Sequence, residues 1–173
     1  MFFTKAGFVT AAALFAQGQA AAIASVPAGL NIIQSVTVDN ATLTWYGNAG
    51  PATRSTQEAR GAQDVGCGSN RIQCATSHAY DGPLCLKLFS TLTNVDMPVE
   101  PRSVCLGQGT DQCCISWSKT TIFSMEQKDV LPSAKRVYSE CGPYYSKSGQ
   151  EWNVLLDGTC VSQCLSNRPD GCK

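Results

Sequence analysis

The stretch Cys-Cys-Ile-Ser-Trp-Ser-Lys at residues 113–119 sets Cys113, Ile115 and Trp117 at alternate positions. A period of two is typical of a β-strand, in which successive side chains point to opposite faces of a sheet. Cys113 and Cys114 are therefore expected to form disulfides with separate partners. One should reach a helix cysteine through the core, and the other a loop or terminal cysteine on the far face. A disulfide between the two would contradict the strand.

Ten cysteines lie in the second part of the 173-residue chain, and none lies before residue 67. Their density and even number are typical of a disulfide scaffold formed in an oxidising compartment. We expect all ten to be paired, although ten cysteines allow about 945 pairings, so the connectivity stays open. Zinc sites need closely spaced cysteine pairs such as C-x2-C, which are missing here, so we predict no metal and no cofactor. The ten are Cys67, Cys74, Cys85, Cys105, Cys113, Cys114, Cys141, Cys160, Cys164 and Cys172.

The first residues predict export. Lys5 precedes an apolar, alanine-rich run, and small residues continue to Ala24 with two Ala-x-Ala endings. These are the parts of a secretory signal peptide, and the run is too short to span a bilayer. We therefore predict a signal peptide at residues 1–24 and a secreted, extracellular protein without a transmembrane segment. Asn40, in the sequon Asn-Ala-Thr, is the predicted glycosylation site.

The rest of the chain divides into two predicted parts. Alternating residues on both sides of Asp39-Asn40 predict a hairpin, and residues 47–64 lack large apolar side chains, as a linker does. Residues 25–64 are thus predicted to form an amino-terminal hairpin and flexible linker, and residues 65–173 a disulfide-bridged domain. We expect the bridged domain to fold without residues 25–60.

Two helices and several strands are predicted in the bridged domain. One helix begins at Asp81-Gly82-Pro83 and the other between residues 129 and 132, and each carries one cysteine on its apolar face. Asp157-Gly158 predicts a two-residue hairpin turn. The order of elements predicts a small, disulfide-rich α+β sandwich in which an antiparallel sheet carries both helices on one face. The expected strands are residues 102–106, 113–119, 152–156 and 159–162, with a short strand before Cys67 or Cys74.

Charge narrows the class of partner. Removing the leader removes Lys5, which leaves 12 of the 13 Lys and Arg residues against 13 Asp and Glu residues, a net charge near −1. A duplex nucleic-acid binder needs a basic face, so we predict no nucleic-acid partner. The predicted partner is an unknown extracellular protein, glycan or membrane target.

Three phrases resemble a secreted, cysteine-rich fungal family with a "WD-like" domain, which is distinct from WD40 propellers. They are residues 113–118, residues 153–160 and the tail Cys-Leu-Ser-Asn-Arg-Pro-Asp-Gly-Cys at residues 164–172, and the resemblance spans Cys67 to Cys172. The chain has no Trp-Asp dipeptide, and the resemblance implies no defined activity, so no catalytic residues carry over.

A weaker likeness, in element order and cysteine density, is to the fungal killer toxins and killer-toxin-like effectors. It implies a toxin or effector directed at competing microbes or a host. The pair Lys135-Arg136 is a possible processing site in this context, but the favoured interpretation is two solvated residues on the outer face of the second helix.

No catalytic set is evident. His78 is the sole histidine, and Ser77 and Asp81 are too near it in sequence to converge with it as a triad. No carboxylate pair for glycoside cleavage stands out. Among the aromatic residues, Trp117 and Trp152 are interpreted as core, and Tyr144 and Tyr145 as an exposed contact surface.

These observations predict a secreted, non-enzymatic effector or killer-toxin-like protein of unknown target. A cell-wall glycan-binding module is the alternative, motivated by the tyrosine pair and the near-neutral charge. A small secreted hydrolase is the second alternative, motivated by the compartment alone.

Overall fold

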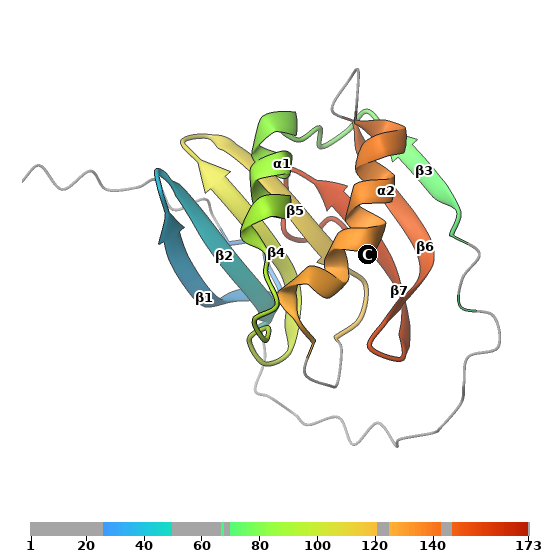
Figure 1. Cartoon of the computed structure of the whole chain (residues 1–173), viewed down its shortest axis with the longest axis horizontal. Coiled ribbons are helices and arrows are strands. Elements are labelled where there is room, and N and C mark those ends of the chain that lie inside the picture. Colours follow the sequence, from blue (N-terminus) through green and yellow to red (C-terminus); the bar gives the residue numbers. More distant parts are fainter. Residues whose placement is uncertain (1–25, 50–66, 68–69, 121–124, 143–146, 173) are drawn as a thin grey trace, which may run out of the picture.

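The fold was described from a computed structural model, which covers residues 26–49, 67, 70–120, 125–142 and 147–172. A seven-stranded, fully antiparallel sheet has the order β1-β2-β4-β5-β7-β6-β3, and both helices cover the same face of it (Figure 1). The predicted disulfide-rich α+β fold is confirmed. The elements are β1 Leu30–Val38, β2 Ala41–Asn48, β3 Ile72–Ala75, α1 Gly82–Thr91, β4 Pro101–Gln108, β5 Asp111–Trp117, the 3-10 helix η1 Gln127–Val130, α2 Leu131–Cys141, β6 Ser148–Leu156 and β7 Thr159–Ser166.

Helix α1 begins where the sequence predicts. The backbone N–H of Leu84 donates to Asp81 Oδ1 at 2.7 Å, which satisfies one of the amides that a helix start leaves free. Pro83 needs no partner at this position. The buried side of the helix carries Cys85 and Leu88 toward the sheet.

Helix α2 lies close to the sheet. A Cβ atom on Gly149 of β6 would be 2.6 Å from Val137 Cγ1 and 2.8 Å from Cys141 Sγ, so the approach of helix and strand requires glycine there. Cys141 joins Cys74 of β3 by a disulfide, which fixes the carboxyl end of α2 to an edge of the sheet.

The amino-terminal hairpin is part of the same sheet. Strands β1 and β2 meet at Asp39–Asn40, and β2 pairs with β4 and buries Trp45 in the common core. The division at residue 64 therefore does not separate two structural units. The expectation that the bridged part folds without residues 25–60 stays a prediction, and the burial of Trp45 in the common core argues against it. The composition of a connection does not reveal whether the strands on its two sides join one sheet.

Two sequence predictions fall largely on residues that the structure does not describe. The signal peptide at residues 1–24 lies outside the described part, as do residues 50–66 of the predicted linker. Residues 47–48, which the composition places in the linker, are the last residues of β2.

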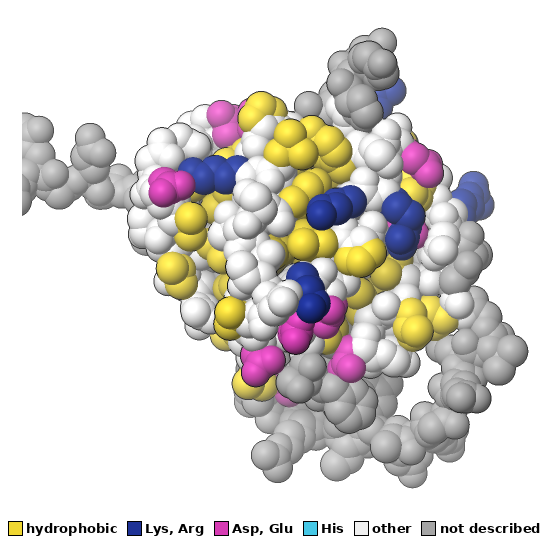
Figure 2. Space-filling model, viewed as in Figure 1, with side chains coloured by type: hydrophobic (Ala, Val, Ile, Leu, Met, Phe, Trp, Pro, Cys, Tyr) yellow, Lys and Arg dark blue, Asp and Glu magenta, His cyan; other side chains and the backbone are white. Residues whose placement is uncertain are grey.

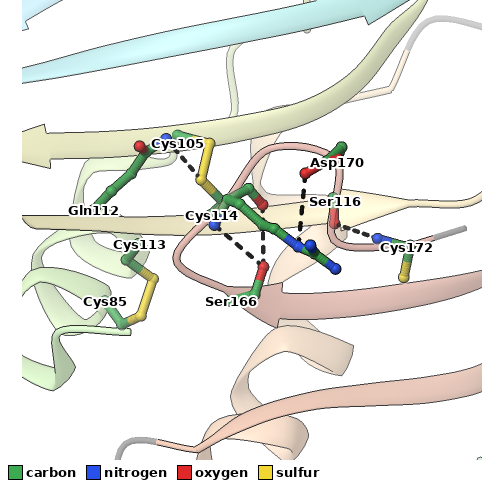
Figure 3. The surroundings of a disulfide bond; sticks show 10 residues. Cys85, Cys105, Gln112, Cys113, Cys114, Ser116, Ser166, Asp170 and Cys172 are labelled. Atoms are coloured by element: carbon green, nitrogen blue, oxygen red, sulfur yellow. Dashed lines mark hydrogen bonds and ion pairs between the residues drawn. A yellow bond between two sulfur atoms is a disulfide. The ribbon is translucent and has the colours of Figure 1, made fainter. Parts of the chain in front are cut away.

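The cysteines of the described residues are all paired. Cys113 bonds to Cys85 of α1, as the strand alternation predicts, and Cys114 bonds to Cys105 of β4 (Figure 3). The expectation of a loop or terminal partner for Cys114 is wrong. Cys105 and Cys114 are direct neighbours in the β4–β5 register, with Cα atoms 4.0 Å apart. The other disulfides are Cys67–Cys160, Cys74–Cys141 and Cys164–Cys172.

Removing Cys85–Cys113 by alanine replacement of both cysteines should destabilise the protein more than the same removal of Cys105–Cys114. The closed loops of 28 and 9 residues correspond to about 3.6 and 2.6 kcal/mol of chain-entropy stabilisation. Removing Cys85–Cys113 also leaves a gap in the packing between α1 and the sheet. Denaturant unfolding of the two double variants measures the difference. Equal stabilities, or the reverse order, would contradict the packing described for α1.

Candidate functional site

The sheet face opposite the helices carries mostly polar side chains. It holds the Cys105–Cys114 disulfide beside the buried Tyr46 of β2. Burial raises the pKa of the Tyr46 hydroxyl, although side-chain hydrogen bonds with Gln112 and Thr44 oppose the shift. The phenol therefore stays neutral at physiological pH.

The carboxyl-terminal segment, residues 167–172, folds back over part of this open face. The backbone N–H of Cys172 donates to Ser116 Oγ of β5 at 3.2 Å (Figure 3). Cys172 is also bonded to Cys164 of β7 by a disulfide. A second attachment lies at the beginning of the segment, where the N–H of Asn167 donates to the carbonyl of His78 at 3.1 Å. The segment is thus fixed at both ends.

A groove of about 190 Å³ lies between this segment and the open face of β3, β6 and β7. Side chains from three strands, from the loop after β3 and from the carboxyl-terminal segment line it. The lining residues are Gln73, Ala75, Ser77, His78, Ser148, Gly149, Gln150, Trp152, Cys164, Ser166, Arg168 and Gly171.

Two glutamines form the floor of the groove. Gln73 of β3 is the register partner of Gln150 of β6, which in turn faces Cys164 of β7. Directly opposed residues of antiparallel strands share a face, so the two amides lie side by side. Each amide supplies both donors and an acceptor to a ligand above the sheet.

Trp152 lies in the groove because β6 contains a bulge. Alternation along residues 152, 154 and 156 predicts that Trp152 joins Val154 and Leu156 in the core. The β6–β7 register instead shifts between Glu151 and Val154, with Asn153 at φ 57°. One extra residue turns the Trp152 side chain to the opposite face. Its interpretation as a core residue is therefore wrong.

The indole of Trp152 is supported by Arg71, which directly precedes β3. The guanidinium carbon of Arg71 lies 5.7 Å from the ring centroid, and the backbone N–H of Trp152 donates to the Arg71 carbonyl at 3.1 Å, which fixes the main chain beneath the ring. A cation over an aromatic face is a favourable contact that restricts the ring. The half-buried indole is thus held in one orientation in the groove.

Serine hydroxyls shape the walls of the groove. Ser148 Oγ donates to the Ser77 carbonyl at 2.6 Å, and Ser166 Oγ donates to the Arg168 carbonyl at 3.0 Å. Both hydroxyls therefore use their hydrogens on the backbone of the walls. Within the described part of the chain, no hydrogen bond joins the His78 imidazole to a serine or a carboxylate.

One permanently charged side chain, that of Arg168, is found among the described residues that line the groove. Arg168 Nε lies 3.6 Å from Asp170 Oδ1, and Asp170 is not among the lining residues. Among the residues that the structure describes, no aspartate or glutamate lines the groove. In the described residues no group of three or more His, Cys, Asp and Glu side chains could hold a metal ion.

The other predicted site residues lie elsewhere. Tyr144 and Tyr145 fall within residues 143–146, outside the described part of the chain. Asn40 is exposed at the β1–β2 turn, where its Oδ1 accepts a hydrogen bond from Lys87 Nζ at 3.4 Å. A glycan at Asn40 stays a prediction.

Lys135 and Arg136 are both exposed on α2, as expected, but Arg136 also contacts the sheet. Arg136 forms an ion pair with Glu151 of β6, with Nη2 and Nε both 2.9 Å from Oε1, and Glu151 is completely buried. The helical pattern correctly places Arg136 on the outer face of α2. It does not reveal that the long Arg136 side chain reaches past the helix to Glu151 on the sheet.

The model of the fungal WD-like family matches residues 37–172. The chain belongs to this family. The match begins well before Cys67, so the fungal WD-like domain includes β2 as well as the bridged elements. The family likeness therefore covers more of the chain than the range from Cys67 to Cys172 that the sequence phrases indicate. The tail phrase at residues 164–172 ends β7 and forms the segment that walls the groove. No curated protein and no solved structure matches this fungal WD-like protein.

The helices are short. Over the part of the chain that the structure describes, none is long and apolar enough to cross a membrane.

Proposed function

We propose that this protein is a secreted, non-enzymatic, effector-like protein that acts by binding a neutral cell-wall glycan in the groove on the open face of its sheet. The observation that carries the proposal is the position of Trp152 beside the paired amides of Gln73 and Gln150. A glycan target combines two hypotheses from the sequence, which are the effector role and the glycan-binding alternative.

The groove offers the two kinds of contact that a sugar ring needs. One face of a pyranose presents C–H groups, which pack on an indole, and its hydroxyls need donors and acceptors at the edge. Amide side chains supply both, because each carries a carbonyl oxygen and an NH₂ group. A few polar groups around an apolar surface are typical of small-ligand sites.

The size and charge of the groove favour a neutral polymer. Its volume of about 190 Å³ is below the ~300–1,000 Å³ of enclosed small-molecule pockets. It suits one ring of a longer chain that lies across the surface. The described lining carries a single guanidinium, already near Asp170, and so offers a polyanion no cluster of cations.

The same lining favours binding without cleavage. Glycoside hydrolysis by the usual route needs two carboxyl groups, and none is found among the described residues that line the groove. Serine hydrolysis needs a base hydrogen-bonded to the nucleophile, whereas the Ser148 and Ser166 hydroxyls donate to backbone carbonyls. The hydrolase alternative therefore has less support.

Secretion and an effector role rest on the leader and the disulfides. The cysteine density is that of proteins exported to an oxidising compartment. One disulfide, Cys164–Cys172, holds the segment that walls the groove. Such a covalent attachment keeps the wall in place outside the cell, where a chain end would otherwise fray.

Replacing Trp152 by alanine should weaken retention on one of chitin, β-glucan or mannan about tenfold or more, because it removes the stacking surface. Depletion of the secreted protein by each insoluble polymer measures this. Leu155→Ala, a matched loss of an exposed apolar side chain on the same strand, should bind as the unchanged protein does. The proposal fails if none of the three polymers retains the protein, or if W152A is retained equally.

A further inference from the structure

Strand β1 is an edge without a neighbour on one side. It pairs with β2 and with no other strand of the described sheet. Seven of its nine residues are exposed, whereas the opposite edge, β3, has only four residues. A long edge exposes a row of backbone N–H and C=O groups that can pair with another strand.

The features that usually protect an edge are few here. Residues 30–38 contain no charged residue and no proline. The side chains of Ile32, Ile33 and Val36 are 43%, 40% and 43% exposed. A register shift between Ile32 and Gln34 protects the first half, but the pairing from Gln34 to Val38 is regular. Charge, proline and bulges are the devices by which natural edges avoid association.

We propose that β1 pairs antiparallel with β1 of a second copy of this chain, about a twofold axis through Val36. In this register Val36 meets its own copy, and Ser35 meets Thr37 of the second copy. Val36 is opposite Leu43 of the core in the β1–β2 register, so it lies on the helix side of the sheet. Ser35 is opposite Thr44 and lies on the polar side. The two central valines thus meet each other on the helix side, and hydroxyls meet hydroxyls on the polar side.

Charge favours a second copy over a foreign strand. An uncharged strand gives a foreign partner no charge to recognise, and it brings no like charges together in a symmetric pair. The nearest acid, Asp39, is paired with Lys87 Nζ at 3.2 Å. In the proposed register the two Asp39 residues lie six positions apart along the strands, about 20 Å, which is well beyond the Debye length of about 8 Å.

The described elements around β1 leave room for this pairing. Helix α1 packs mainly on β4 and β5, and Figure 1 shows β1 at the margin of the sheet beyond both helices. In Figure 2, apolar side chains lie along this margin, and the charged groups nearest to it gather toward one end. The sheet could therefore continue from one copy into the next.

The mass of the full secreted protein, measured by light scattering over a range of concentrations, tests the proposal. The unchanged protein should shift from the monomer to the dimer mass, and Val36→Lys should remain monomeric at the same melting temperature. Val99→Lys, a matched change at a residue 83% exposed and away from β1, should dimerise normally. Thr37→Lys places the charge on the other face of β1 and provides a second test if V36K lowers the melting temperature.

Two results would overturn the proposal. One is a monomer mass for the unchanged protein at every protein concentration up to about 1 mM. The partner of the β1 edge would then be a foreign strand or another part of this chain. The other is a V36K or T37K variant that folds and dimerises as the unchanged protein does.

Discussion

Replacing Trp45 by alanine will lower the free energy of unfolding by ~3–5 kcal/mol, the range for removing a large buried aromatic side chain. Trp45 is 1% exposed, lies on β2, and packs in the core beneath the helices. The loss is a large share of the 5–15 kcal/mol that a typical domain has in total. Urea unfolding of the disulfide-intact protein measures it.

A matched change on the neighbouring strand separates burial from a general effect of the hairpin. Ile32→Ala on β1 removes a half-exposed side chain and should cost less than about 1.5 kcal/mol. If W45A were no less stable than I32A, the hairpin would not belong to the core. The bridged part would then fold alone, as the linker composition first indicated.

Replacing Arg136 by alanine will destabilise the protein by about 3 kcal/mol. The substitution leaves the carboxylate of Glu151, 0% exposed, without its cation. Breaking a fully buried ion pair from one side typically costs ~3–5 kcal/mol. We expect the lower end because the Arg136 side chain is 46% exposed, so water can reach part of the site. Guanidinium unfolding at pH 7 gives the value.

The neighbouring Lys135 provides the control for Arg136. It is an exposed cation on the same helix, and Lys135→Ala should change the stability by less than about 0.5 kcal/mol. Adding Glu151→Gln to R136A removes the uncompensated charge and should recover part of the loss. Equal stabilities of R136A and K135A would show that the buried carboxylate does not depend on Arg136.

The fold was predictable where local patterns and global structure agree. Asp81 and Pro83 set the start of α1, and Asp157-Gly158 sets the β6–β7 turn. The alternation around Cys113 correctly predicted a disulfide between this cysteine and a cysteine on a helix. Each of these signals acts within a few residues, so one sequence carries enough information to read it.

Several of the wrong predictions share one physical cause, which is pairing between segments that lie apart in the sequence. The partner of Cys114 is set by the β4–β5 register, and the place of Trp45 by the pairing of β2 with β4. Neither can be read from the chain around the residue itself. Arg136 belongs to the same class, because its partner lies on a strand 15 residues later.

The candidate site was the least predictable part. Trp152 follows a strand pattern that places it in the core, and a bulge of one residue reverses its direction. The signal that could have raised the possibility is Trp152-Asn153 itself, since asparagine tolerates the left-handed backbone that Asn153 adopts. The groove further requires the carboxyl-terminal segment, whose path depends on the Cys164–Cys172 disulfide.

The indole N–H signals of the three tryptophans provide the most direct test of glycan binding in the groove. A two-dimensional ¹H–¹⁵N spectrum of the secreted protein is recorded while soluble oligosaccharides of chitin, β-glucan or mannan are added. We predict that one of the three shifts the Trp152 signal, while the Trp45 and Trp117 signals stay fixed, because both rings are buried on the helix side and Trp117 Nε1 donates to the Pro101 carbonyl. An unchanged Trp152 signal with all three sugars, or binding that shifts only signals far from the groove, would contradict the account.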